Sequence, residues 1–121
     1  MKYLILVYSN PATRETWHGF SASERAEAWQ AHTTLAEKLS ASGELVLSQA
    51  LADPSQAKRV TVREDRTITS DGPFAEVKEH LAGFYLIECD TIERAIEHAS
   101  QVPEATFGLV EVRPVAELNG S

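Results

Sequence analysis

The sequence predicts an α+β domain with a ferredoxin-like split βαβ layout, an antiparallel sheet and an extra hairpin. Three observations support this prediction. The expected elements run strand, helix, strand, hairpin, strand, helix, strand, an order that folds into one sheet through two crossovers. The central strands are apolar on both faces. The length of 121 residues suits a single core rather than two domains.

The first half of the chain is expected to form a strand, a helix and a second strand. The apolar run 2–8 predicts the first strand, closed by a turn signal at 9–11. Ser21 and Glu24 have the spacing of a capping box, and Gly43 is a natural left-handed end for the helix that they open. Residues 45–50 predict the second strand, and 52–55 a loop. The helix has an inward stripe at helical spacing, formed by Ala28, Trp29, His32, Leu35, Ala36 and Leu39.

The second half is expected to form a hairpin, a strand, a helix and a last strand. Residues 58–63 alternate between polar and apolar side chains and predict a strand with one wet face. A turn at 64–66 and a short return strand at 67–70 complete the hairpin, and residues 71–73 end it. A capping signal at 90–93 opens a helix that runs to about residue 101, before Pro103. The remaining expected segments are strands at 81–89 and 107–113, one domain over 1–116 and a frayed tail at 117–121.

The central strands present apolar side chains to both sides of the sheet. Tyr3, Ile5 and Val7 point one way, and Leu4, Leu6 and Tyr8 point the other. Two helices cover only one face, and a large apolar patch is rare on a monomer. The sequence therefore predicts a homodimer in which a second copy packs against the open sheet face.

Composition excludes several classes of partner. The 18 acidic residues outnumber 11 basic ones, the net charge is −7, and no Lys/Arg cluster suits a nucleic acid. Cys89 is a single cysteine, and the four histidines lack the i,i+4 spacing of a helical zinc site, so neither a disulfide nor a metal is expected. The sequence contains no glycine-rich nucleotide fingerprint, no membrane-spanning run and no signal peptide. We therefore expect no cofactor, no membrane partner and a cytoplasmic location.

One motif resembles a known family. Residues 71–79, Asp-Gly-Pro-Phe-Ala-Glu-Val-Lys-Glu, followed by 81–88, resemble the signature of the YCII-related family in its DGPF branch, and both chain ends agree. The resemblance implies a dimeric α+β barrel. Many DGPF-type proteins are encoded beside extracytoplasmic-function sigma factors. YCII relatives include a dehydrochlorinase of a chlorinated hydroxyquinol, which is thought to use a His–Asp dyad.

The dyad of those relatives can be carried over only in part. His32 matches the spacing of the helix histidine in YCII-type relatives. Those relatives commonly place Asp-Pro after the second helix, where this chain has Val102-Pro103, and Val77 stands where Thr is usual. If the dyad is retained, Asp71 or Glu76 is expected to replace the lost carboxylate.

Each candidate residue also has a purely structural interpretation. His32 is either a general base or acid, or a core histidine bonded to a backbone carbonyl. Asp71 suits a turn, and the charges around Glu76 suit a solvated loop. Lys78 could pair with a substrate anion, and the Tyr85 hydroxyl needs a buried partner or a cavity water. Tyr8 and Arg113 lie near strand ends and likewise need a polar partner. Lys78, Tyr85, Tyr8 and Arg113 are therefore the candidate substrate-binding residues.

Two functions follow from the sequence. The first is a cofactor-independent enzyme with lyase, dehydrochlorinase or isomerase-type acid–base chemistry on a small aromatic or carbonyl-bearing substrate. The alternative is a non-catalytic ligand-binding or regulatory module associated with an extracytoplasmic-function sigma factor.

Overall fold

The main body is a four-stranded antiparallel sheet with helices on one face. The computed structural model describes residues 1–118, so residues 119–121 of the expected tail lie outside the described part. The sheet order is β2-β5-β1-β6, and each neighbouring pair is antiparallel. This order confirms the predicted ferredoxin-like α+β class. The strands are β1 (Lys2–Ser9), β2 (Leu45–Ala50), β5 (His80–Glu88) and β6 (Val110–Pro114).

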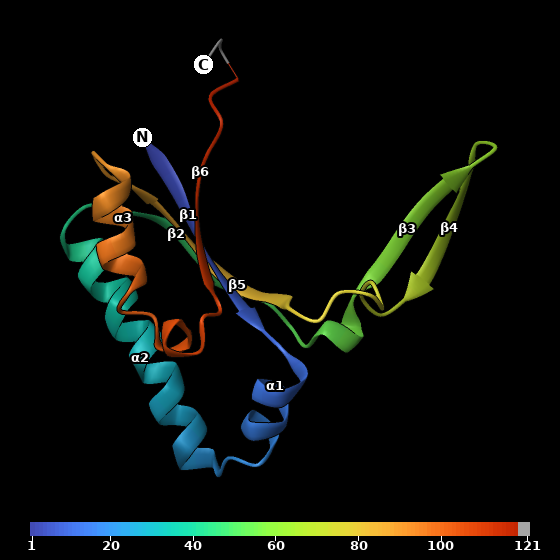
Figure 1. Ribbon diagram of the computed structural model, residues 1–121, viewed down its shortest axis with the longest axis horizontal. Helices are drawn as coiled ribbons and strands as arrows, with labels where there is room; N and C mark the ends of the chain where they lie inside the picture. The colour runs from blue at the N-terminus through green and yellow to red at the C-terminus, as the bar shows by residue number, and fades with distance from the viewer. Residues whose placement is uncertain (119–121) are drawn as a thin grey trace.

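Two helices lie along one face of this sheet, and a third lies beyond its end (Figure 1). The third helix differs from the sequence prediction, in which the segment 9–11 forms a turn. Asn10 instead caps a helix: its side chain accepts from the Thr13 backbone N–H, and Pro11 occupies the first turn, where a missing N–H costs nothing. The three helices are α1 (Pro11–His18), α2 (Ala22–Ala41) and α3 (Ile92–Ala99).

The predicted limits of α2 are confirmed, whereas the segment after α3 differs from the prediction. Ser21 and Glu24 form the capping box, and Gly43 follows with a φ of +79°. Beyond α3, Pro103 begins a short 3₁₀ helix, η2 (Pro103–Phe107), which ends at Gly108 with a φ of +71°. Phe107 therefore belongs to η2, and the last strand starts three residues later than predicted. Another such turn, η1, covers Pro54–Gln56.

The core lies between the sheet and the helices α2 and α3. Ile5 and Ile87 are fully buried at its centre, and Leu39 of α2 packs against the same cluster. Among residues 1–118, no helix has the length and apolar character needed to cross a membrane.

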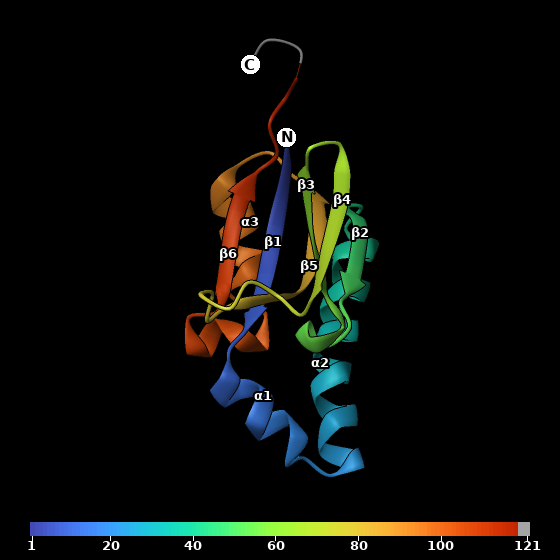
Figure 2. The ribbon, with the colours of Figure 1, turned by 90° about the vertical axis from the view of Figure 1, so that its right-hand side faces the viewer.

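A hairpin extends from the other side of the sheet. Strands β3 (Lys58–Arg63) and β4 (Arg66–Asp71) pair only with one another, and their residues are exposed apart from the half-buried Arg59. Figures 1 and 2 place this hairpin, here called the arm, on the side of the sheet away from α2 and α3. The arm confirms the predicted hairpin and extends its return strand by one residue at each end.

Candidate active site

His32 lies on the inward face of α2, where that helix meets β5 and η2. Leu35 and Leu39 follow it on the same helical face and are 3% and 0% exposed. Their burial fixes the rotation of α2, so the imidazole points toward the sheet. The His32 side chain keeps 24% of its surface exposed and is therefore within reach of a small molecule.

Both ring nitrogens of His32 contact a polar side chain. Nδ1 lies 2.6 Å from the hydroxyl oxygen of Tyr85, which projects from β5. Nε2 lies 2.8 Å and 3.0 Å from the two carboxylate oxygens of Glu104 in η2. A helix, a strand and a 3₁₀ turn thus bring together three residues that are far apart in the sequence.

The chemistry of these groups assigns the protons. A carboxylate only accepts hydrogen bonds, so Nε2–H donates to Glu104, and in the neutral imidazole this leaves Nδ1 with a lone pair. The Tyr85 hydroxyl then donates to Nδ1, which satisfies a group that is only 4% exposed. Burial raises the pKa of Tyr85 to about 12, and the nearby Glu104 charge acts in the same direction. The hydroxyl therefore keeps its proton and acts as a donor at neutral pH.

Glu104 owes its position to the start of η2. Val102 is 2% exposed and anchors the chain in the core, and Pro103 then begins the turn that directs Glu104 toward α2. The carboxylate thus follows the proline, whereas the relatives with a His–Asp dyad place an Asp before it. Sequence reasoning missed Glu104 because the pattern of those relatives points to the position before Pro103. The available signal was an acidic residue on the other side of that proline.

Aromatic rings line the approach to His32. The Trp29 ring lies 6.5 Å from the imidazole, centroid to centroid, and the Trp17 ring of α1 meets Trp29 edge-on at 5.7 Å. The prediction that Trp29 faces the core is wrong, because this side chain is 50% exposed. Figure 1 shows the reason: the first half of α2 extends beyond the sheet, toward α1.

The carboxylates expected beside His32 lie elsewhere. Asp71 ends β4 at the base of the arm and pairs with Lys58. Glu76 and Lys78 are exposed in the segment between β4 and β5. The predicted pairing of His32 with Asp71 or Glu76 is therefore corrected to a pairing with Glu104.

Two further candidates lie on the opposite side of the sheet from His32. Tyr8 donates its hydroxyl to a carboxylate oxygen of Glu111 at 3.0 Å. Glu111 and Arg113 pair with Leu6 and Leu4, so they share the face away from the helices. Of the four predicted substrate-binding residues, the structure brings Tyr85 to His32 and places Tyr8, Arg113 and Lys78 elsewhere.

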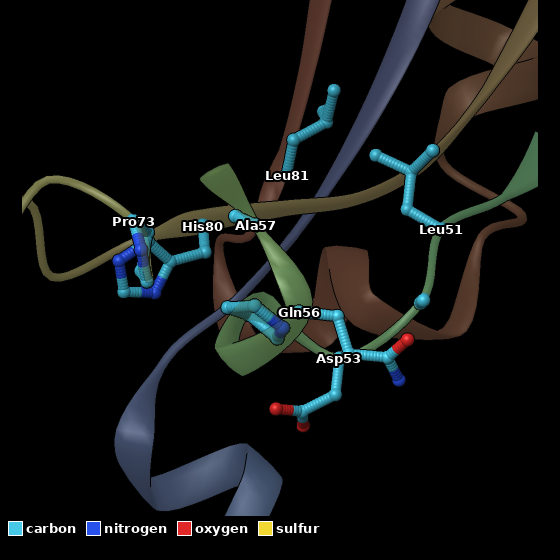
Figure 3. A pocket seen from close by; sticks show the side chains of 9 residues that line it. Leu51, Asp53, Gln56, Ala57, Pro73, His80 and Leu81 are labelled. Carbon is cyan, nitrogen blue, oxygen red and sulfur yellow. The ribbon is translucent and has the colours of Figure 1, made fainter. Parts of the chain in front are cut away.

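A pocket of about 350 Å³ lies at the base of the arm. Figure 3 shows His80 beside Pro73 on one side of it, with Leu51 and Leu81 on its walls. Both ring nitrogens of His80 are buried without a hydrogen-bond partner among the described residues. The Asp53 carboxylate at the pocket accepts from the Ser55 backbone N–H instead. The pocket therefore lacks the histidine–carboxylate pair found at His32.

Comparison with known proteins gives a family and one relative. The family model described as YCII-related domain matches residues 1–119. An uncharacterised protein of Rhizobium meliloti (strain 1021) is 32% identical over 118 residues, which cover 96% of this chain and 93% of that protein.

Proposed function

The chain belongs to the YCII-related family, and we propose that it is a cofactor-independent acid–base enzyme acting on a small aromatic or carbonyl-bearing molecule. One observation carries the proposal. An imidazole and a carboxylate lie 2.8 Å apart, both about one-quarter exposed, beside a half-exposed tryptophan. This arrangement provides a proton-transferring pair next to an apolar surface for a substrate.

The surroundings of the pair favour an uncharged aromatic substrate. Trp29 offers a flat ring face beside His32, and aromatic pairs stabilise one another beyond simple burial. Glu104 contributes a negative charge. Arg25, a basic side chain of α2, lies over the Trp17 ring and donates to backbone carbonyls of α1. An anionic substrate would therefore be repelled.

The chemistry that this pair supports is removal of a proton from a saturated carbon next to a carbonyl, including that of the keto form of a phenol or quinol. The C–H bond breaks, the proton moves to the pair, and the electron pair stays on the substrate as an enolate. Return of the proton to a different carbon completes an isomerisation. Loss of a halide ion from the neighbouring carbon completes an elimination and forms a double bond, after which the proton passes to water.

Exchange of substrate protons with deuterium tests this proposal even when the product is unidentified. A panel of uncharged phenols, quinols and cyclic ketones is incubated with the protein in D₂O, and loss of carbon-bound proton signals is followed by NMR. We expect enzyme-dependent exchange for at least one class, and His32→Ala to lower its rate at least about 100-fold. His18→Ala, at the exposed end of α1, is the matched control and should keep the wild-type rate. Equal rates for His32→Ala and wild type would overturn the proposal.

We further propose that a second copy covers the open sheet face. Leu47 on this face is 45% exposed, and Val60 and Val62 on the arm are 64% and 66% exposed. The arm stands on this same side, and an isolated two-stranded hairpin is marginally stable in water. A two-fold dimer would cover both apolar surfaces in one interface.

Light scattering tests the dimer. The expected mass is twice the 13.3 kDa of one chain. The double substitution Val60→Lys and Val62→Lys should lower the mass to that of one chain, whereas Ile96→Lys on α3 should leave it unchanged, because Ile96 lies on the helical side. A wild-type protein with the mass of one chain would contradict the proposal.

The regulatory alternative remains a prediction from the family resemblance. A pull-down with an extracytoplasmic-function sigma factor from the same organism tests it directly. If that sigma factor co-purifies with wild type and His32→Ala alike while no substrate exchanges protons, the regulatory function is favoured over the enzyme.

A further inference from the structure

We propose that Glu104 is the catalytic base that touches the substrate, and that His32 is a positioning residue that acts through it. This inference rests on the proposed acid–base function and assigns the roles within it. It reverses the expectation from the sequence, in which the histidine carries the proton and a carboxylate orients the ring.

The hydrogen bonds of the imidazole leave it without a free basic nitrogen. Nε2 carries a proton and donates a hydrogen bond to Glu104. Nδ1 already accepts a hydrogen bond from the Tyr85 hydroxyl at 2.6 Å. Tyr85 is 4% exposed, so a substrate could reach Nδ1 only by displacing a buried hydroxyl from the core. That displacement is unfavourable, because it would exchange a 2.6 Å hydrogen bond to Nδ1 for the remaining, longer contact of 3.4 Å to the His32 backbone carbonyl.

Glu104 has the opposite character. Its side chain is 26% exposed, and among the described residues its carboxylate accepts hydrogen bonds from the His32 ring alone. A carboxylate has about four lone-pair positions, so one Nε2–H leaves acceptor capacity on both oxygens. The exposed, unsaturated acceptor of the site is therefore the carboxylate.

The resulting step is balanced in atoms and charge. A substrate C–H bond breaks, an O–H bond forms on one Glu104 oxygen, and the electron pair remains on the substrate as an enolate or expels a leaving group. The Nε2–H bond holds the other oxygen throughout. The imidazole keeps its single proton, fixed by the Tyr85 hydroxyl at Nδ1, and does not change charge.

Replacement by glutamine separates the two roles. Glu104→Gln keeps the size of the side chain but removes its basicity, so we expect proton exchange to fall at least about 100-fold. His32→Gln keeps an N–H donor toward Glu104 but no basic nitrogen, so we expect it to restore most of the rate lost in His32→Ala and to remain within about 10-fold of wild type. If His32→Gln loses as much as Glu104→Gln, the histidine is the base and this inference is overturned.

The failures of the two proposals are distinguishable. If neither His32→Ala nor Glu104→Gln lowers the exchange rate, the proposed function falls and the inference falls with it. If both variants lose activity and His32→Gln is as inactive as His32→Ala, only the assignment of roles fails.

A second measurement needs no substrate. Nitrogen-15 NMR of the histidine-labelled protein at neutral pH reports which ring nitrogen of His32 carries the proton. We expect the proton on Nε2, and we expect Tyr85→Phe to change the Nδ1 signal because Nδ1 loses its donor. A proton on Nδ1 with a bare Nε2 would overturn the inference, whatever the panel of substrates shows.

Discussion

Two histidine–glutamate pairs lie within residues 1–118, and they differ in what else holds the carboxylate. His98–Glu44 joins α3 to the start of β2, with the two side chains 9% and 14% exposed. Glu44 also accepts two bonds from Arg94 and one from the Ser42 hydroxyl. His32–Glu104 is about one-quarter exposed. The number of hydrogen bonds that the carboxylate accepts and its burial thus distinguish the His98–Glu44 pair from the pair that we propose exchanges protons with a substrate.

The pKa of Glu44 shows what the hydrogen bonds to its carboxylate do. The hydrogen bond from Arg94 is the main cause that lowers this pKa to about 2, with smaller contributions from Ser42 and His98. Burial opposes this shift. A carboxylate so stabilised as an anion is a poor base at neutral pH, because it has little affinity for a proton.

The largest effect expected from this comparison is on stability. Glu44→Ala leaves Arg94 and His98 without the carboxylate that both contact, so we expect a loss of about 2–3 kcal/mol in the free energy of unfolding. Glu104→Ala removes a partly exposed contact and should cost less than about 1 kcal/mol. Urea unfolding followed by circular dichroism measures both. Similar losses for the two variants would mean that the pairs have the same structural role.

The next effect concerns Tyr85, the hydroxyl that belongs to the His32 site. Its folded-state pKa of about 12 lies above the ordinary value of 10.0. As the pH rises, the unfolded chain therefore loses the Tyr85 proton before the folded chain does. The contribution of this group to the free energy of unfolding is complete below pH 10 and declines between pH 10 and 12. Between pH 10 and 12 we expect Tyr85→Phe to lose about 2 kcal/mol less free energy of unfolding than wild type. Equally steep alkaline limbs in the stability profiles of wild type and Tyr85→Phe would contradict this expectation.

Local signals explain which parts of the molecule were predictable. The limits of α2 follow from Ser21, Glu24 and Gly43, and the arm follows from alternation around a tight turn. The start of α1 was misinterpreted because Asn10-Pro11 favours both a turn and a helix N-terminus. Such ambiguity is resolved by the contacts that the helix makes, here Trp17 with Trp29.

The site was predictable only in its histidine and its tyrosine. Helical spacing indicated that His32 would face the sheet, and the apolar surroundings of Tyr85 indicated that its hydroxyl needed a buried partner. Glu104 was not predicted because its position depends on η2. The path of η2 is set by the burial of Val102 and by the left-handed Gly108, and not by a regular sequence period. A contact across 72 residues leaves no periodic pattern in one sequence, and the acidic residue next to Pro103 was the only local hint of it.

The smallest effect expected is on the acid side of the stability profile. The folded-state pKa of Glu44 is about 2, below the ordinary value of 4.5, so its stabilisation is complete above about pH 4.5 and is lost as the pH falls toward 2. Because the pair is partly hydrated, we expect Glu44→Gln to remove only about 1–2 kcal/mol of this acid loss. Arg94→Met removes the main cause of the shift and should flatten the profile in the same pH range. If Arg94→Met kept the wild-type profile, Arg94 would not be what holds Glu44 as an anion. The hydrogen bonds that the Glu44 carboxylate accepts could then not explain the difference between the two pairs.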